Sequence, residues 1–207
     1  MTHEEAPVPG LLLAFVGPSG VGKSSLCAFL LDACPNLNLS ISYTTRQPRG
    51  RERNGVAYHF VDEETFMAMV SRGEFIEYAR VHGNLYGTAV EVVRRARGSG
   101  QDLLFDIDYQ GASQLKNAFP DAIAIMIAPP NMTVLETRLR GRSTDSEETI
   151  AARLAFARTE LSQVDGFDYI IVNGDFDRAC QDALSIYRAQ QLVLHRQRSF
   201  VTEQLLS

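Results

Sequence analysis

Lysine is almost absent from this chain of 207 residues. Of its 20 Lys and Arg residues, only Lys23 and Lys116 are lysines, and the other 18 are arginines. The 25 Asp and Glu residues outnumber these cations and give a net charge of −5. Proteins that bind nucleic acid or anionic membranes broadly carry a basic surplus, so the charge argues against both as partners. A polyanionic ligand must instead be met by local clusters of arginine.

Long hydrophobic runs and paired cysteines are also missing. The longest apolar run, 122–128, has seven residues, whereas a membrane-spanning helix needs about 20. Cys27, Cys34 and Cys180 are an odd set without the spacing of a zinc site or a disulfide framework, so we expect reduced structural residues. The acidic N-terminus has no basic flank or apolar stretch of a secretory signal. Residues 1–10 are therefore predicted to be a disordered leader, and the protein to be cytoplasmic.

The residues that are present have the composition of an ordinary globular domain, with 45% hydrophobic and 22% charged. Apolar runs alternate with segments of helical period, a pattern typical of buried parallel strands joined by crossover helices. Strands are expected at 11–16, 103–107, 123–128 and 169–172. Helices are expected at 23–33, 109–118, 133–140, 146–163 and 175–195. The predicted fold is a three-layer α/β domain, 11–195, with a parallel central sheet.

The segment 39–90 has a different pattern, because its short strands alternate polar and apolar residues around one expected helix at 63–71. It predicts a small, partly antiparallel insertion between two core segments, 11–38 and 91–195. The polar, glycine-bearing stretch 141–148 separates two expected helices. It suits a mobile lid and equally suits an ordinary helix connection.

The sequence GPSGVGKS at 17–24 matches the phosphate-binding pattern G-x-x-x-x-G-K-[ST], between an apolar run and an amphipathic one. Its glycines let successive backbone N–H groups point at phosphate oxygens, and the following helix presents its positive end to the same anion. Lys23 can reach the β- and γ-phosphates, and the Ser24 hydroxyl can ligate Mg²⁺. The glycine order disfavours a dinucleotide fold. We predict a P-loop NTPase fold whose triphosphate site comprises Gly17, Pro18, Ser19, Gly20, Val21, Gly22, Lys23, Ser24 and Ser25.

Four arginines lie within eight residues, at positions 46, 49, 51 and 53. Guanidinium groups this close repel one another unless anions or carboxylates lie nearby, and their planar forks bind phosphate in a bidentate manner. One interpretation is a second phosphate site. The other is a solvated basic loop with contacts to Glu52.

The chain resembles guanylate kinases of the bacterial type. The segments that carry the resemblance are GPSGVGKSS, SYTTRQPR, NGVAYHF, GEFIEYA, NLYGT, LLFDIDYQGA, LRGRSTDSEETIAARL and DYIIVN, which cover roughly 11–194. The resemblance implies a nucleoside monophosphate kinase that transfers the γ-phosphoryl group of ATP to GMP with Mg²⁺, giving GDP and ADP in purine nucleotide metabolism and GMP recycling. It also implies that 39–90 is the NMP-binding insertion and that a helical lid spans about 138–153.

The resemblance also implies a GMP site. The residues that match it are Ser42, Arg46, Arg49, Tyr58, Glu77, Tyr86, Thr88 and Asp108. By this match the arginines and tyrosines hold the phosphate, the two smaller hydroxyls lie near guanine O6, and both carboxylates contact the base. Guanine offers two adjacent donors, N1–H and the 2-amino group, which the Glu77 carboxylate accepts as a pair, whereas the lone pair of adenine N1 would be repelled.

Catalysis of this kind needs no nucleophilic side chain, because the acceptor phosphate attacks the γ-phosphorus while the protein aligns the groups and compensates charge. The matching catalytic residues are Lys23, Arg46, Arg138, Arg142 and Arg153. The last three bracket the stretch 141–148, so closure of a lid would carry them in and exclude water.

Two further polar residues complete the expected donor site. Asn173 matches a family residue near the adenine of ATP. Asp106 lies near the carboxyl end of an expected strand and is a candidate, with Ser24, for holding Mg²⁺ or its waters. The sequence does not divide the roles between Asp106 and Asp108.

Two alternatives stay open at this point. Scaffold proteins contain guanylate kinase-like domains that bind proteins without phosphorylating GMP, although these usually belong to longer chains and often lack an intact P-loop. A related P-loop kinase for a phosphorylated sugar or another nucleotide is disfavoured by Glu77 and the tyrosines together. Departures from the family pattern at Arg51, Ser143 and Gly174 put lid stiffness and donor affinity in question. Protein partners, the choice between monomer and homo-oligomer, and the role of the tail 196–207 are not fixed.

Overall fold

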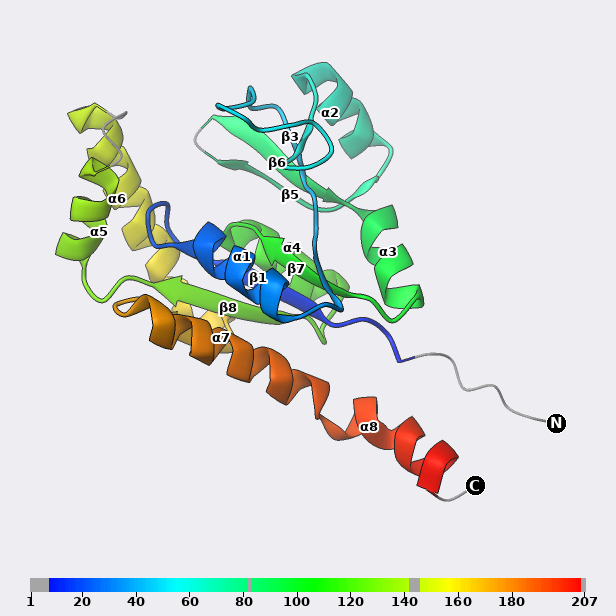
Figure 1. The fold of residues 1–207 in the computed structure, drawn as a ribbon. Coiled ribbons are helices and arrows are strands. Elements are labelled where there is room, and N and C mark those ends of the chain that lie inside the picture. The colour runs from blue at the N-terminus through cyan, green and yellow to red at the C-terminus, as the bar shows by residue number, and fades with distance from the viewer. Residues whose placement is uncertain (1–7, 82, 142–145, 206–207) are drawn as a thin grey trace.

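The computed structural model describes residues 8–81, 83–141 and 146–205 (Figure 1). Within them, five parallel strands form a central sheet in the order β2-β7-β1-β8-β9. The strands are β1 (Leu12–Val16), β2 (Leu37–Leu39), β7 (Asp102–Asp106), β8 (Ile123–Ala128) and β9 (Tyr169–Val172). Because β1 lies in the middle, the loop that follows it opens at the carboxyl edge between β7 and β8, where ligand sites of α/β sheets form.

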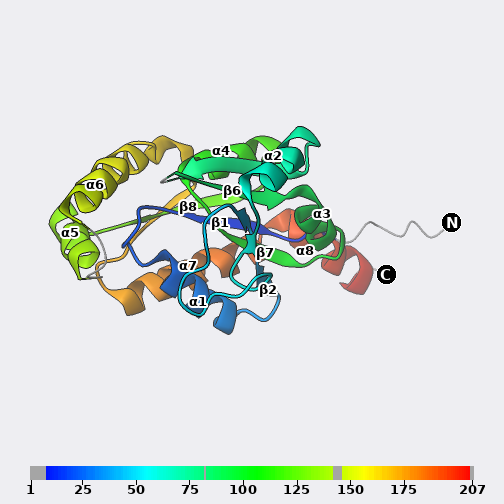
Figure 2. The same cartoon turned by 90° about the horizontal axis from the view of Figure 1, so that it is seen from above.

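Helices cover both faces of this sheet (Figure 2). Those of the described residues are α1 (Lys23–Ala33), α2 (Glu63–Ser71), α3 (Val90–Gly98), α4 (Tyr109–Ala118), α5 (Met132–Arg140), α6 (Glu147–Leu161), α7 (Phe176–Gln191) and α8 (Leu194–Phe200), with short turns of other helix types at Val164–Gly166 and Val201–Leu205. Alternate residues of β1 point to opposite faces: Leu13 and Phe15 pack with residues of α1 and α7, whereas Leu12 and Val16 pack with residues of α3 and α4. Each fully buried side chain of this size stabilises the fold by about 1.5–3 kcal/mol, so β1 is the centre of the core.

A second sheet lies beside the first and has the order β4-β3-β6-β5. Its strands are β3 (Tyr43–Thr44), β4 (His59–Phe60), β5 (Phe75–Val81) and β6 (Asn84–Ala89). Pairs β3–β6 and β5–β6 are antiparallel, and β3–β4 is parallel. Asp62 is the N-cap of α2, and its carboxylate accepts a hydrogen bond from the Thr65 N–H. The predicted partly antiparallel character of this segment is confirmed.

The expected elements agree closely with the structure where the apolar pattern is strong. Strands 123–128 and 169–172 and helices 23–33, 63–71 and 109–118 are confirmed to the residue. Two elements were missed, and one expected helix was wrong. Leu37–Leu39 pairs in parallel with β7 and belongs to the central sheet, and α3 was not predicted. The expected helix 175–195 divides into α7 and α8, because Leu192 ends the first and Val193 has extended backbone.

A buried carboxylate, that of Asp102, lies at the edge of the central sheet opposite to the P-loop. Asp102, at the start of β7, is 0% exposed and accepts hydrogen bonds from the Leu11 N–H at 2.7 Å and the Tyr187 hydroxyl at 2.7 Å. Gln191 and Arg196 donate to it at 2.5 and 3.4 Å. A buried charge is tolerated only when it is paired and hydrogen-bonded, so these contacts tie α7 and α8 to the sheet.

The structure bears on the expected leader at the N-terminus and on the three cysteines. Residues 1–7 of the predicted leader lie outside the described residues, whereas Gly10 is buried and donates to the Arg97 carbonyl at 3.3 Å. Cys27, Cys34 and Cys180 are free and buried, as expected of structural thiols. In the described part of the chain, no helix has the length and hydropathy to span a membrane.

Candidate active site

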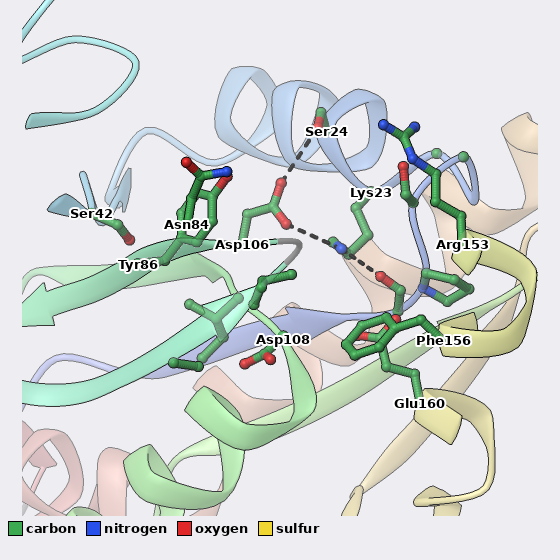
Figure 3. A pocket seen from close by; sticks show the side chains of 18 of the residues that line it. Lys23, Ser24, Ser42, Asn84, Tyr86, Asp106, Asp108, Arg153, Phe156 and Glu160 are labelled. Atoms are coloured by element: carbon green, nitrogen blue, oxygen red, sulfur yellow. Dashed lines mark hydrogen bonds and ion pairs between the residues drawn. The ribbon is translucent and has the colours of Figure 1, made fainter. Parts of the chain in front are cut away.

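A cavity of about 720 Å³ opens between the carboxyl edge of the central sheet, the four-stranded sheet and α6 (Figure 3). Most residues that the sequence singled out line it: Gly17, Pro18, Ser19, Gly20, Gly22, Lys23, Ser24, Ser25, Ser42, Arg49, Tyr58, Glu77, Tyr86, Asp106, Asp108 and Arg153. Those that are described but do not line it are Val21, Arg46, Thr88, Arg138 and Asn173. Arg142 and Ser143 lie outside the described residues. A cavity of this size accommodates small-molecule ligands.

The P-loop depends on glycine for two reasons. Gly17, Gly20 and Gly22 have φ angles of 148°, 90° and 100°, a region that other residues rarely adopt. In addition, a Cβ at Gly17 would lie 2.2 Å from the Ile127 carbonyl oxygen, and one at Gly22 would lie 2.4 Å from Nδ2 of Asn173. The loop therefore folds tightly against β8 and against the residue that follows β9, and α1 begins directly after it.

Lys23, Ser24 and Asp106 form one polar cluster at the mouth of the P-loop (Figure 3). The Lys23 ammonium donates to the Gly17 carbonyl at 2.5 Å and lies 3.5 Å from Oδ1 of Asp106. The Ser24 hydroxyl donates to Oδ2 of the same carboxylate at 3.4 Å. Register explains the meeting, because Asp106 is paired with Phe15 of β1 and so ends beside the loop. A cation and a hydroxyl are thus gathered on one carboxylate next to the helix N-terminus.

Two side chains from distant parts of the chain hold the P-loop backbone at the Val21 carbonyl. Nδ2 of Asn173 donates to it at 2.7 Å, and the Arg138 guanidinium donates to it at 3.4 Å. Arg138 also donates to the Asn173 carbonyl at 3.0 Å. Both residues were predicted from the sequence as ligand contacts, and in this structure they brace the loop. Oδ1 of Asn173 is buried with no partner among the described residues, so one acceptor stays available.

Arg46 lies in the loop that follows β3 and is buried, without lining the cavity. Its guanidinium makes hydrogen bonds to both carboxylate oxygens of Glu52, at 2.9 and 3.0 Å, and to the Gln47 carbonyl at 2.8 Å. It also lies 5.3 Å from the ring centre of Tyr58. The hydrogen bonds from Arg46 lower the pKa of Glu52, which stays ionised. The anticipated contact between this basic loop and Glu52 therefore exists, and the carboxylate occupies a position at which a phosphate could be bound by the same fork.

Two tyrosine rings lie next to Arg46. Tyr58 and Tyr86 meet edge to face with ring centres 5.9 Å apart. Burial, with smaller contributions from Asp106 and Tyr86, raises the pKa of Tyr58 to about 12. Its hydroxyl therefore remains a proton donor at neutral pH.

Glu77 is a buried carboxylate that lines the cavity from the four-stranded sheet. It lies on β5, is 3% exposed, and its Oε1 has no hydrogen-bond partner among the described residues. Burial raises its pKa to about 7; the Thr88 hydrogen bond opposes the shift and the charge of Asp108 adds to it. Thr88 lies opposite Glu77 on β6, and its hydroxyl is 3.4 Å from the Ser42 hydroxyl. Among the described residues, an acceptor without a partner therefore lies at one end of the cavity beside the Ser42 and Thr88 hydroxyls, an arrangement suited to a ligand with paired donors.

The two aspartates after β7 have different surroundings. Asp106 faces the P-loop, as described above. Asp108 is the N-cap of α4 and accepts from the Gly111 N–H at 2.9 Å and from Nε2 of Gln110 at 3.1 Å. The geometry therefore associates Asp106 with the P-loop end of the cavity and Asp108 with the Glu77 end.

Comparisons with known proteins agree with this geometry. A family model described as guanylate kinase matches residues 11–190. The chain is 52% identical over 183 residues to the guanylate kinase of Chromobacterium violaceum. The aligned residues cover 88% of this chain and 87% of that protein. It is 50% identical over 190 residues to the guanylate kinase of Syntrophotalea carbinolica, with 92% and 90% covered. The chain belongs to the guanylate kinase family.

A solved structure extends the comparison to the fold. The crystal structure of guanylate kinase from Anaplasma phagocytophilum is 31% identical, has a TM-score of 0.79 and covers 96% of each chain. The protein therefore has the guanylate kinase fold and activity: it phosphorylates GMP to GDP, and ATP and GMP are its substrates.

Helix α6 of this guanylate kinase contributes a face that sequence reasoning missed almost entirely. Arg153, Phe156 and Glu160 point from it into the cavity (Figure 3). Only Arg153 was expected. The spacing of three and four residues that places them on one helical face is visible in the sequence, but such a spacing occurs by chance in most helices, and nothing in the sequence marks this face as facing a ligand. Further lining residues not predicted are Ala79, Val81, Asn84, Ile107, Glu148, Thr149 and Ala152.

Glu160 is a buried carboxylate within range of the charges at the P-loop. It is 2% exposed. Burial raises its pKa to about 7; Lys23 opposes the shift, and Asp108 and Asp106 add to it. Because the pKa in the folded state lies above the usual value, the folded protein binds a proton that the unfolded chain has lost. Stability is therefore present at low pH and falls as the pH rises toward and through about 7.

Glu160→Gln is expected to raise the melting temperature at pH 8 by about 5 °C, because it removes a desolvated charge that faces Asp106 and Asp108. At pH 5 the wild-type carboxyl is protonated in the folded state, so the gain should be smaller. Thermal unfolding of both proteins at the two pH values measures this. An equal gain at pH 5 and pH 8 would contradict an ionised Glu160.

Proposed function

We propose that this guanylate kinase transfers the γ-phosphoryl group of ATP to GMP in a Mg²⁺-dependent reaction within one cavity, giving ADP and GDP for purine nucleotide metabolism and GMP recycling. The observation that carries the proposal is the pairing of two ends in that cavity. A P-loop with Lys23 lies at one end, and Glu77, whose Oε1 has no partner in the described part of the chain, lies at the other. A donor triphosphate and an acceptor base can therefore be bound at once, with their phosphates meeting between them.

At the donor end, the backbone N–H groups of residues 17–25 bind the phosphates of ATP and Lys23 compensates charge at the γ-phosphoryl group. Lys23 is already oriented by the Gly17 carbonyl and Asp106. Asn173 and Arg138 keep the loop in shape through the Val21 carbonyl. Oδ1 of Asn173, which has no partner within 8–81, 83–141 and 146–205, is a suitable acceptor for the amino group of adenine.

The residues around Asp106 fit a magnesium ion that arrives with ATP. Ser24 and Asp106 offer hard oxygen ligands 3.4 Å apart. Among the described residues, no group of three His, Cys, Asp or Glu side chains could hold a metal by itself. Mg²⁺ commonly uses one or two protein oxygens together with substrate phosphates and water, which suits this set. When bound, the ion neutralises charge on the donor phosphates.

At the acceptor end, Arg46, Arg49, Tyr58 and Tyr86 bind the phosphate of GMP. Arg46 and the two rings are already packed together, which orients their donors. Glu77 accepts from N1–H and the 2-amino group of guanine, a role supported by its burial and its unpartnered oxygen.

The remaining polar groups of the acceptor site complete the base contacts. The hydroxyls of Ser42 and Thr88, 3.4 Å apart, donate to guanine O6, and Asp108 contacts the base. These contacts orient the acceptor so that its phosphate oxygen is aligned with the γ-phosphorus.

The lid arginines finish the charge compensation. Arg153 lines the cavity from α6, and Arg142 belongs to the same proposal although it lies outside the described residues. Arg138 contributes in one of two ways. Either its guanidinium releases the Val21 carbonyl and contacts the transferring phosphoryl group, or it keeps that hydrogen bond and holds the P-loop in place. Closure of α5 and α6 over the cavity excludes water, which would otherwise be an acceptor for the phosphoryl group.

A panel of acceptors tests the function. GMP, dGMP, AMP, CMP and UMP are compared in a coupled assay with ATP, with Mg²⁺ and with excess EDTA. We expect GMP to be used at least about a hundredfold better than AMP, and turnover to be lost with EDTA. Equal or better turnover of AMP would refute the guanine assignment.

A further inference from the structure

Gly111, in the first turn of α4, lies against the Glu77 carboxylate. A Cβ placed on Gly111 would lie 2.5 Å from Oε2 of Glu77, 3.2 Å from its Cδ and 3.4 Å from Cβ of Ile107. Cβ atoms in proteins essentially never come within 3.0 Å of a non-bonded neighbour, so an added methyl group requires the carboxylate to move.

The backbone at Gly111 does not itself demand glycine. The residue lies in the regular helix α4, and its φ is not in the positive region that other side chains avoid. Alanine is the better helix former at such a position. The space taken by the Glu77 carboxylate is therefore the feature that explains a glycine here.

The surrounding residues restrict where the Glu77 carboxylate can move. Glu77 is 3% exposed and lies between β6 and α4, with Thr88 opposite it on the neighbouring strand. Glu77 lines the cavity together with Asp108, so the cavity is the direction in which its carboxylate has room to move. A methyl group at Gly111 would thus push the carboxylate toward the space that the acceptor base occupies.

We propose that Gly111 is a specificity-determining position for the acceptor, because its missing side chain sets where the Glu77 carboxylate lies. The inference rests on the proposed guanine-reading role of Glu77. Gly111 also donates its N–H to Asp108 at 2.9 Å, so one residue positions both carboxylates at this end of the cavity. It touches them and no reacting atom, and it is a positioning residue.

The test compares Gly111→Ala with a matched control, Gly98→Ala. Gly98 is also a helical glycine, in α3, and a Cβ there meets nothing within 4 Å. Steady-state kinetics are measured with GMP and with IMP, which lacks the 2-amino group that Glu77 is proposed to accept. Gly111→Ala is expected to lower kcat/KM for GMP by about tenfold through KM, to reduce the GMP:IMP preference, and to leave the KM for ATP unchanged. Gly98→Ala should alter none of these.

A second variant separates contact from general damage. Glu77→Asp shortens the side chain by one methylene and removes the clash, so Gly111→Ala should have a smaller effect on GMP use in that background than in the wild type. If Gly111→Ala alone does not fold, recovery of folding in the Glu77→Asp background supports the same contact, and failure to recover contradicts it.

The outcomes also separate this inference from the proposed function. A GMP:IMP preference within twofold of wild type in Gly111→Ala overturns the role of Gly111, even when Glu77→Gln weakens GMP use. An unchanged preference in Glu77→Gln removes the guanine-reading role itself, and the Gly111 inference with it.

Discussion

Replacing Lys23 by alanine is expected to lower kcat for GMP phosphorylation by about a thousandfold. The structure orients Lys23 at the P-loop through the Gly17 carbonyl at 2.5 Å and Asp106 at 3.5 Å. Its loss leaves the charge that develops on the transferring phosphoryl group without that partner. It also leaves Asp106 facing the donor phosphates as an unpaired negative charge. Single-turnover kinetics with saturating ATP and GMP measure the chemical step directly.

The other lysine of the chain is the natural control. Lys116 lies on α4 outside the cavity and forms an ion pair with Asp168 at 2.6 Å. Lys116→Ala should leave kcat within a factor of two, because the change is remote from the phosphates. A Lys23→Ala enzyme that retained a tenth of wild-type kcat would contradict the role assigned to this side chain.

Replacing Glu77 by glutamine is expected to lower kcat/KM for GMP by about a hundredfold and to shrink the GMP:AMP preference by a similar factor. The carboxylate presents two acceptors to two guanine donors, whereas an amide presents one acceptor and one donor. One hydrogen bond is lost, and a donor then faces a donor in a buried site. Initial rates over a range of GMP and AMP concentrations give both ratios.

Loss of activity in this variant should not come from loss of stability. Burial raises the pKa of Glu77 to about 7, so the wild-type carboxylate is ionised and poorly solvated at pH 8. A neutral amide removes that unfavourable charge, and the melting temperature at pH 8 should not fall. Glu74→Gln is the matched control, since Glu74 directly precedes β5 and pairs with Arg72 on the surface. Its GMP:AMP preference should equal that of the wild type.

The sequence predicted the parts of the molecule in which one local pattern settles the structure. The apolar run before residue 17, the glycine spacing and the amphipathic run after it fix β1, the P-loop and α1 without any long-range information. Asp106 was found because carboxyl ends of parallel strands meet at one edge. Glu77 was found only through the family resemblance, because a lone glutamate in an alternating strand carries no signal of burial.

Other features depend on contacts that no local pattern contains. Arg138 and Asn173 meet at the Val21 carbonyl across 117 and 152 positions of sequence. Strand β2 is three residues long, and it was missed because pairing with β7 rather than its own composition defines it. Glu160 shares a helix with many charged residues, and only its 2% exposure sets it apart. Gly111 is likewise ordinary until the position of Glu77 is known.

Arg46 and Arg49 belong to one loop but do not start from the same state. Arg46 is already immobilised by Glu52 and the Gln47 carbonyl, whereas the Arg49 side chain is exposed and donates no hydrogen bond to the described residues. Ordering a long side chain on binding costs about 0.5–1.5 kcal/mol. For Arg46 that conformational entropy was lost when the protein folded. In the proposed acceptor site, the entropic cost of ordering a guanidinium group on the phosphate therefore falls on Arg49, whereas Arg46 is ordered in advance and exchanges its contact with Glu52 for the phosphate.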